Sequence, residues 1–354
     1  MAAVASIGVA GAGLLGRLLA WRLGHAGHAV SVFDSAAGPD PAYDGHGAAA
    51  FSAAGMLCPT AESDRADARV CELGWRSIER WQELVRALDA PHLMQRRGSL
   101  LLAHRADGGA AGRMLARCAG GRAPPRRLDS AGLADLEPAL QGAAQAWLLP
   151  GEAQIDPPAT LHRLFEDAAP SVRWHWRTPV AQTECGALRT AQGERLRFDV
   201  VFDVRGLGAR LPGLRGVRGE TVWLHAPAHG LTRPVRLLHP RHAVYLVPRG
   251  PDRVFVGASE IESEDRSPVS LRSAVELMAA AHSVMPALAE ARIERLDRNL
   301  RPALPDHLPQ VDVQHGLVRI NGLFRHGWLM APALVEDALS AAGFAPLQQE
   351  AAHA

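Results

Sequence analysis

The stretch from Val4 to Asp34 constrains the fold of this chain more than any other part of the sequence. A short apolar run, Ile7–Ala10, is typical of a buried strand and leads directly into a G-x-G-x-x-G hexapeptide, Gly11–Gly16. In this pattern the first glycine permits a tight turn, the second lets a pyrophosphate approach the backbone, and the third lets a helix pack closely on the strand. The segment predicts the start of a dinucleotide-binding fold.

The residues after this turn complete a βαβ unit. Leu18, Leu19 and Leu23 give a helix one apolar side, Ala29–Phe33 alternates as a second strand, and Asp34 ends that strand. A bare G-x-G-x-x-G could be accidental in a chain with 34 glycines, but the complete unit is specific. An acid at this place can bind a ribose hydroxyl and disfavours a 2′-phosphate, so the pattern favours FAD or NAD over NADP.

The composition fits one large or two medium globular domains. With 354 residues, of which 47% are hydrophobic and 21% charged, the chain can bury a sizeable core. A formal net charge of +1 argues against nucleic acid or an anionic membrane as a partner. Arg17 and Arg22 interrupt the apolar N-terminal run before the roughly 20 residues that a membrane span needs. We therefore expect a cytoplasmic protein that does not bind a membrane.

One reactive side chain, that of lysine, is missing from the chain. It contains no lysine, so its 38 basic residues are all arginine. This excludes the lysine Schiff base of a pyridoxal-phosphate enzyme, a P-loop and a lysine general base.

No metal site is predicted. The four cysteines have no C-x-x-C spacing, and the sixteen histidines form no H-E-x-x-H motif. The pairs His25/His28 and His239/His242 have ligand-like spacing, but no acidic residues stand beside them.

The rest of the chain divides into a region with helices and a later region rich in strands. Residues 65–88 have the apolar spacing of an amphipathic helix, whereas residues 104–127 are rich in Gly, Ala and Arg without a regular period. Short β-prone runs follow between positions 221 and 258, and the last two, 243–247 and 254–258, predict a hairpin. No second G-x-G-x-x-G occurs, which indicates a single bound dinucleotide.

The segment Phe51–Pro59 consists mostly of small residues without a clear period. Small residues permit close approach of the backbone, either by another helix or by a flat ligand. By periodicity alone, tight packing is the favoured of the two interpretations.

Other motifs along the chain are more specific. The two most specific are A-A-G-M-L at Ala53–Leu57 and F-R-H-G-x-L-x-A-P at Phe324–Pro332. Four more are Arg205–Ala209, Val217–Glu220, Tyr245–Arg249 and Leu300–Pro302. With these motifs and the N-terminal fingerprint, the chain resembles the FAD-dependent D-amino-acid oxidase family over nearly its whole length. It is most similar to the glycine oxidases of thiamine biosynthesis.

This resemblance implies an α/β fold (α+β overall). A Rossmann-like FAD-binding domain of the D-amino-acid oxidase type would be interleaved with an antiparallel-sheet substrate domain. The implied FAD-binding domain comprises residues 1–88, 147–216 and 300–354, and the implied substrate-binding domain comprises residues 89–146 and 217–299.

The resemblance also identifies the dinucleotide as FAD. It implies that Ala54–Met56 lies against the isoalloxazine, so ligand contact replaces tight packing as the favoured interpretation of this segment. It also implies that the backbone of Leu323–Leu329 meets the flavin and that Val180 touches the adenine half. The implied FAD-binding residues are Gly11, Gly13, Leu14, Leu15, Gly16, Asp34, Ser52, Ala53, Ala54, Gly55, Met56, Val180, Gly206, Leu323, Phe324, Arg325, His326, Gly327, Trp328 and Leu329.

The sequence departs from the family pattern at two places near the cofactor. Asp34 stands where many relatives have glutamate, and residues 36–50 lack the Ser/Thr cluster that relatives offer to the pyrophosphate. The sequence therefore does not identify which groups of residues 36–50 contact the pyrophosphate. Some relatives attach flavin through a cysteine in the C-terminal half; the last cysteine here is Cys185, so we expect non-covalent FAD.

Three residues are implied to form the catalytic site. By resemblance, Tyr245 contacts the substrate carboxylate, Arg301 pairs with it, and Arg325 lines the pocket near the flavin. A guanidinium matches a carboxylate with two parallel hydrogen bonds, which supports the assignment of Arg301 independently. The alternatives are a surface or interdomain salt bridge for Arg301 and an ordinary amphipathic strand position for Tyr245.

The implied reaction is oxidative deamination of glycine or another small amine or D-amino acid. The substrate would lose hydride from its α-carbon to flavin N5, and the imine would hydrolyse with release of ammonia. Dioxygen would reoxidise the flavin and give hydrogen peroxide. A homo-oligomer is possible within this reading, and the sequence does not select the substrate among small amines.

Three alternatives stay open at this point. The nearest is a dehydrogenase of the same fold that passes electrons to a quinone or a protein carrier. A second is a flavin-binding subunit without oxidase activity. An NAD-dependent dehydrogenase is more distant, because nothing after Asp34 fits a nicotinamide site.

Overall fold

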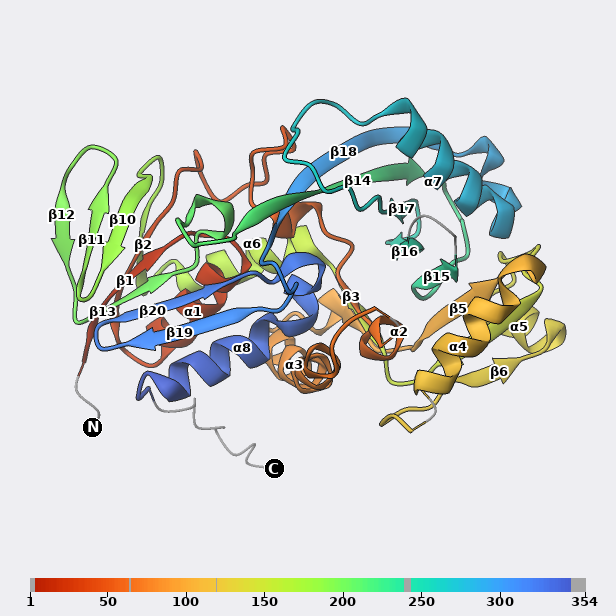
Figure 1. The fold of residues 1–354 in the computed structure, drawn as a ribbon, viewed down its shortest axis with the longest axis horizontal. Coiled ribbons are helices and arrows are strands. Elements are labelled where there is room, and N and C mark those ends of the chain that lie inside the picture. Colours follow the sequence, from red (N-terminus) through yellow and green to blue (C-terminus); the bar gives the residue numbers. More distant parts are fainter. Residues whose placement is uncertain (1–3, 64, 119, 239–242, 345–354) are drawn as a thin grey trace. The chain divides into compact units, whose positions relative to one another are not determined.

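The computed structural model describes residues 4–63, 65–118, 120–238 and 243–344. Contacts within the chain define two compact units, each built from separate stretches of sequence (Figure 1). Unit 1 comprises Met1–Pro41, Pro158–Arg215 and Pro302–Ala354, and unit 2 comprises Ala42–Pro157 and Gly216–Arg301. Residues 42–88 and 147–157 thus belong to unit 2. The resemblance places these residues in the FAD-binding domain instead, and that assignment stays a prediction.

Unit 1 is built on a six-stranded sheet in the order β19-β20-β13-β1-β2-β9. The pairs from β20 to β9 are parallel, and β19 is an antiparallel edge strand. The predicted strand–turn–helix–strand unit is present as β1, α1 and β2. The strands are β1 (Ser6–Ala10), β2 (Ala29–Phe33), β9 (Val172–His175), β13 (Val200–Asp203), β19 (Gln310–Gln314) and β20 (Leu317–Asn321).

Helices and a small second sheet cover this sheet. Helices α1 (Leu14–His25) and α8 (Gly327–Ala341) contact each other, and α6 (Pro157–Ala168) precedes β9. A three-stranded antiparallel sheet of β10 (Val180–Glu184), β11 (Ala187–Thr190) and β12 (Arg195–Arg197) packs on the central strands. The two sheets share a cluster of buried residues: Ala10, Phe33, Val180, Leu188, Val201 and Leu317.

Unit 2 contains an eight-stranded sheet in the order β18-β14-β17-β16-β15-β5-β7-β6. From β14 to β6 the neighbouring strands are antiparallel except β15 with β5, which are parallel. The predicted hairpin is present as β16 and β17, and both strands reach farther into the loop than predicted. The strands are β5 (Ser99–Ala103), β6 (Arg126–Leu128), β7 (Gln145–Leu149), β14 (Arg215–His225), β15 (Val235–Leu238), β16 (Ala243–Arg249), β17 (Arg253–Gly257) and β18 (Arg292–Ala303).

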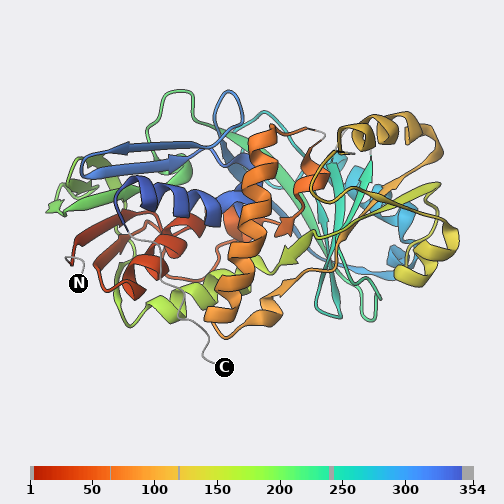
Figure 2. The same cartoon turned by 90° about the horizontal axis from the view of Figure 1, so that it is seen from below.

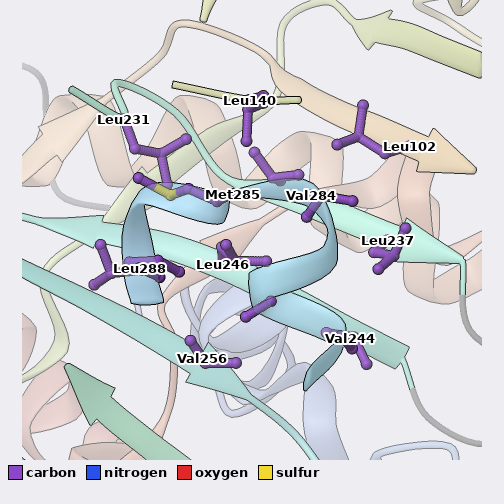
Figure 3. Packing of buried hydrophobic residues seen from close by; sticks show 14 of the residues in the cluster. Leu102, Leu140, Leu231, Leu237, Val244, Leu246, Val256, Val284, Met285 and Leu288 are labelled. Carbon is purple, nitrogen blue, oxygen red and sulfur yellow. The ribbon is translucent and has the colours of Figure 1, made fainter. Parts of the chain in front are cut away.

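The two faces of this sheet differ because side chains alternate along each strand. On one face, Val222, Leu246 and Val256 pack with α7 (Leu271–Val284) and the 3₁₀ turn η5 (Pro286–Glu290) in a large apolar cluster (Figure 3). On the other face Trp223, Val247 and Phe255 form a smaller cluster with Ala54, and Met56 and Tyr245 pack against it. This second face carries most of the residues considered below for substrate binding.

The helices of unit 2 confirm one prediction and correct another. The helix predicted at 65–88 is α3 (Ala68–Ala87, orange in Figure 2), which starts at Asp67 with a side-chain hydrogen bond to Arg69 N. Residues 104–127 were expected to lack regular structure, but they contain α4 (Gly108–Cys118). Only Ala111, Met114 and Cys118 are buried there, so the apolar signal is short. No helix in the described ranges is long and apolar enough to cross a membrane.

The remaining elements of unit 2 are short. They are η1 (Ala49–Ser52), β3 (Met56–Leu57), α2 (Pro59–Glu62), η2 (Pro91–Leu93), β4 (Met94–Gln95), η3 (Arg105–Asp107), α5 (Ser130–Leu136) and β8 (Ala153–Ile155). Strands β3 and β4 flank β8 in a small antiparallel sheet.

Candidate active site

The turn between β1 and α1 requires glycine at two positions. Gly11 has a φ of +107°, and a Cβ on Gly16 would lie 1.9 Å from the carbonyl oxygen of Gly11. Because that oxygen is part of the backbone, it cannot move aside as a flexible side chain could. Gly13 is the N-cap residue of α1, and no side chain caps the N-terminus of this helix. The first N–H groups of α1 are therefore arranged as they are in sites that bind a phosphate.

Asp34 closes the same turn from the end of β2. Its Oδ2 accepts a hydrogen bond from Ala12 N at 2.6 Å, and its Oδ1 accepts one from Ala36 N at 2.7 Å. A carboxylate oxygen has more than one lone pair, so these bonds leave capacity for ribose hydroxyls. The structure thus adds a role that the sequence pattern did not reveal, which is to hold the glycine turn in place.

Arg17 is a buried residue of this region that sequence reasoning missed. Its guanidinium donates to three carbonyl oxygens, those of Ala12 at 2.9 Å, Leu161 at 2.7 Å and Pro39 at 2.6 Å. Burial lowers the pKa of Arg17 to about 10, and the charges of Asp34 and Asp40 oppose this shift. The sequence pattern identified Arg17 only as an interruption of an apolar run. In the fold it ties the glycine turn to α6 and to the segment after β2.

The end of β13 is joined to β10 by a buried ion pair. Arg205 makes two hydrogen bonds to the carboxylate of Asp203, at 2.9 and 2.6 Å, and a third to the carbonyl oxygen of Val180 at 2.6 Å. Burial alone would raise the pKa of Asp203, but the hydrogen bonds and charge of Arg205 outweigh it and the pKa is lowered. Asn321 Nδ2 donates to the carbonyl oxygen of Gly206 at 2.9 Å. Val180 and Gly206 are therefore held in fixed backbone positions.

The segment before α8 has a fixed, turned backbone. Gly322 and Phe324 have φ values of +75° and +49°, and the Phe324 ring stacks on His307 with 4.4 Å between ring centroids. Most of the predicted flavin-contacting residues here are buried; Arg325 and Gly327 are partly exposed. The guanidinium of Arg325 lies 5.8 Å from the Phe324 ring centroid. No side chain caps α8, so unit 1 contains a second helix N-terminus with the same electrostatic character as that of α1.

These features of unit 1 fit the nucleotide half of FAD. The turn leaves no space for a Cβ at Gly16, and the N-terminus of α1 lacks a side-chain cap. Both are properties of a backbone cradle for a pyrophosphate. Of the predicted cofactor residues, unit 1 holds Gly11, Gly13, Leu14, Leu15, Gly16, Asp34, Val180, Gly206 and Leu323–Leu329, and unit 2 holds Ser52, Ala53, Ala54, Gly55 and Met56.

In unit 2 the segment from Ser52 to Met56 is fastened at several points. Gly55 has a φ of +62°, and a Cβ there would lie 2.1 Å from the carbonyl oxygen of Ile155. Asn299 Nδ2 contacts the Ser52 hydroxyl at 3.2 Å, and an Arg249 Nη2 donates to the carbonyl oxygen of Ala54. The backbone of this segment therefore packs tightly, and its contact with a ligand stays a prediction.

Tyr245 and Arg301 both lie over glycines of the eight-stranded sheet. A Cβ on Gly257 would lie 2.7 Å from the Tyr245 hydroxyl oxygen, and a Cβ on Gly219 would lie 2.3 Å from an Arg301 Nη2. Arg301 Nη1 also donates to the carbonyl oxygen of Ser259 at 3.1 Å. The structure thus places both residues in unit 2, on the same face of the sheet, whereas Arg325 is in unit 1.

Glycines 219 and 257 were not predicted as site residues, although a signal for them exists. Glycine inside a strand often marks close approach of another group. Gly257 lies within the β-prone run 254–258, and Gly219 lies two positions before the run that begins at 221. Arg249 had no such signal. It is partly exposed as a residue, but burial of its guanidinium lowers its pKa to about 10, with the charge of Asp156 opposing. It ends the motif Tyr245–Arg249, but nothing in the sequence shows that its guanidinium is buried.

Within the described ranges, no group of three or more His, Cys, Asp or Glu side chains is arranged to hold a metal ion. The absence of a bound metal stays a prediction. His239 and His242 lie outside the described residues. His25 is paired with Asp167 at 3.1 Å, which gives it a structural partner.

Comparison with known proteins gives consistent results. The family model described as DAO, FAD dependent oxidoreductase, matches residues 6–337. A Rhizobium etli protein described as putative thiamine biosynthesis oxidoreductase ThiO is 38% identical over 93% of this chain and 94% of its own length.

Solved structures share the fold. Glycine oxidase from Geobacillus kaustophilus superposes with a TM-score of 0.82 at 22% identity, over 97% of this chain and 96% of that one. Iminodiacetate oxidase from Chelativorans sp. superposes with a TM-score of 0.78 at 25% identity, over 97% of both chains. The predicted fold class is confirmed.

Proposed function

The chain belongs to the DAO family of FAD-dependent oxidoreductases, and we propose that it oxidises a small amino acid or amine, with glycine as the first candidate. The observation that carries this proposal is the placement of Arg301 over Gly219 and of Tyr245 over Gly257. Two hydrogen-bond donors, one of them charged, are thereby presented on one face of a sheet. Similarity to the protein described as ThiO supports a role in thiamine biosynthesis.

FAD, when bound, supplies an acceptor for hydride from the substrate carbon and passes the electrons on to a second acceptor. The residues proposed to hold it are those named from the resemblance, with the glycine turn and Asp34 at its nucleotide half. Binding without a covalent bond is proposed as well. Of the four cysteines, Cys58 and Cys118 are buried, Cys71 is partly buried, and Cys185 is exposed.

The protein's own residues bind and orient the substrate. Arg301 would pair with the substrate carboxylate through its guanidinium, and the Tyr245 hydroxyl would donate a further hydrogen bond. Arg325 is proposed to contribute a second positive charge near the flavin. Because the paired carboxylate restricts where the attached α-carbon can lie in the site, orientation rather than acid–base chemistry would supply much of the rate.

The face around Tyr245 also limits the size of the substrate. Trp223 and Phe255 contact each other edge to face with centroids 5.0 Å apart, and Tyr245 lies parallel to Phe255 at 6.3 Å. These rings form an apolar part of the sheet face that also carries Arg301. Such a surface suits a substrate with little or no side chain, and glycine, sarcosine and D-alanine are the substrates to compare.

The proposed electron acceptor is dioxygen. The amine would lose hydride and a proton to become an imine, water would convert the imine into an oxo acid and ammonia, and dioxygen would take up two electrons and two protons to give hydrogen peroxide. The test is aerobic turnover of the purified protein with each amine, with hydrogen peroxide and the released amine both quantified; the released amine is ammonia from glycine and D-alanine and methylamine from sarcosine. Equal amounts of the two support an oxidase. Ammonia or methylamine formed only with an added quinone or dye acceptor indicates a dehydrogenase, and no turnover with any amine refutes the proposal.

A further inference from the structure

Thr221 stands between the two glycine positions that accommodate Tyr245 and Arg301. It belongs to β14, where it lies two residues after Gly219 and directly before Val222. Val222 pairs with Val256 of the antiparallel strand β17. Gly257 is the next residue of β17 beyond Val256. Alternation along β14 places Thr221 on the same face as Gly219 and Trp223.

The hydroxyl of Thr221 is buried and unsatisfied. Only 5% of the residue is exposed, and its Oγ1 has no hydrogen-bond partner among the described residues. A buried hydroxyl without a partner is costly and uncommon in native proteins, so such a group calls for an explanation. Valine has the same shape and would fill this position without that cost.

The surroundings of Thr221 indicate what its partner would be. Arg301 and Tyr245 lie over the neighbouring glycines and both present hydrogen-bond donors. A hydroxyl can add a third donor to an anion held there, and its own oxygen can accept from a neighbouring group. We propose that the Thr221 hydroxyl donates a hydrogen bond to the substrate carboxylate held by Arg301 and Tyr245, and that it thereby selects for amines that carry a carboxylate. This inference rests on the proposed function.

Thr221 is a positioning residue in this account, because it fixes the carboxylate and does not touch the reacting carbon. The test compares holoenzyme variants by titration with acetate, which has the carboxylate but no amine, followed through the flavin absorption spectrum or by calorimetry. Thr221→Val removes the hydroxyl and keeps the shape. Thr221→Ser keeps the hydroxyl. Thr160→Val is the matched control, since Thr160 is also buried without a hydroxyl partner but lies on α6.

We expect Thr221→Val to weaken acetate binding about tenfold or more, as for loss of a hydrogen bond to a charged group. Thr221→Ser should stay within about threefold of the wild type, and Thr160→Val should bind acetate unchanged. With glycine as substrate, Thr221→Val should raise KM much more than it lowers kcat, and the preference for glycine over glycinamide should fall. Acetate binding by Thr221→Val equal to that of the wild type, or no acetate binding by the wild type, would overturn the inference.

The acetate titration separates this inference from the proposed function. If glycine reduces the wild-type flavin but Thr221→Val binds acetate normally, only the role of Thr221 is wrong. If no amine reduces the flavin but acetate binding still depends on the hydroxyl, the carboxylate site is supported and the proposed oxidase function is wrong. Should Thr221→Val not retain FAD, Thr221→Ala compared with Thr221→Ser gives the same contrast.

Discussion

Arg301 and Tyr245 can lie over the eight-stranded sheet because Gly219 and Gly257 beneath them have no Cβ atoms. Glycine in a strand loses side-chain packing and weakens the strand. Two such glycines on one face, each beneath a polar side chain, indicate that the space left by the missing Cβ atoms is needed to hold these two side chains in place. The consequences can be tested one residue at a time.

Replacement of Arg301 by alanine should raise KM for glycine while FAD stays bound. Loss of one charged partner of a carboxylate costs about 1.5–3 kcal/mol, or roughly ten- to a hundredfold in affinity. Steady-state kinetics and the flavin-to-protein absorbance ratio measure the two parts of this prediction. Arg292→Ala, at an exposed position of the same strand, is the control and should leave KM unchanged. Unchanged kinetics in Arg301→Ala would remove Arg301 from the site.

Gly219→Ala should disturb Arg301 without unfolding the protein. The new Cβ would lie 2.3 Å from an Arg301 Nη2, and the end of a long side chain can move away where backbone cannot. We expect a raised KM, in the direction of Arg301→Ala, with only a small change in Tm. Gly112→Ala is the control, because nothing lies within 4 Å of that position in α4. It should be neutral or stabilise by roughly 0.5–1 kcal/mol. Wild-type KM in Gly219→Ala would show that the guanidinium position is unimportant.

The sequence allowed some of these residues to be identified and not others. Tyr245, Arg301 and Arg325 were proposed from the resemblance, since a motif carries each of them. Arg17 and Arg249 were not assigned a role, although Arg249 lies in the same motif as Tyr245, because a buried arginine looks like a surface arginine until its carbonyl partners are brought near by folding.

At the level of elements, α1 is positioned by the glycine turn. Gly16→Ala would place a Cβ 1.9 Å from the backbone oxygen of Gly11, and neither the turn nor the helix can relax easily. We expect loss of most bound FAD and a lower Tm. Flavin content after purification and thermal unfolding measure this, with Gly112→Ala again as the control. A Gly16→Ala protein that keeps full FAD occupancy would contradict the role of the turn.

Glu152 joins β5 to α2 in unit 2. Its Oε1 accepts from Ala61 N at 2.9 Å, and its other oxygen accepts from the Ser99 hydroxyl. The residue is fully buried. Burial raises the pKa of Glu152 from 4.5 to about 7, although hydrogen bonds from Ser99 and Ala61 and the charge of Arg236 oppose the shift.

This shift makes stability depend on pH with a definite sign. Because the folded protein holds the proton more tightly than the unfolded chain, the stability from Glu152 is complete below about pH 4.5 and is lost as pH rises to about 7. The change is roughly 3 kcal/mol in free energy of unfolding. Denaturant unfolding of the wild type and of Glu152→Gln from pH 5 to 8 measures it. The wild type should lose stability relative to the variant as pH rises, and a constant difference would refute the assignment.

The elements that could be predicted have long, regular apolar patterns. α3 was predicted to within a few residues because its apolar side runs the whole length of the helix. α4 was missed because only three of its residues are buried and its glycines lower helix propensity. The β16–β17 hairpin was found from its turn, but not its full extent, which depends on pairing with β14 and β15.

At the scale of the whole molecule, the two units are interleaved along the chain. Unit 1 is assembled from three stretches and unit 2 from two, so most of the contacts that define each unit join distant parts of the sequence. Local patterns cannot reveal such an arrangement. The resemblance to a known family implies interleaved domains with boundaries at 216 and 300, and this division stays a prediction. It places residues 42–88 in the FAD-binding domain, whereas chain contacts group them with unit 2.

The central claim is that small amines reduce an FAD bound to this chain. Anaerobic titration of the purified holoenzyme with glycine, sarcosine and D-alanine, followed by the visible absorbance of the flavin, tests it most directly. We expect at least one of them to bleach the flavin completely, and Arg301→Ala to need roughly ten- to a hundredfold more of the same amine. Flavin absorbance that stays unchanged in excess of all three amines would contradict the claim.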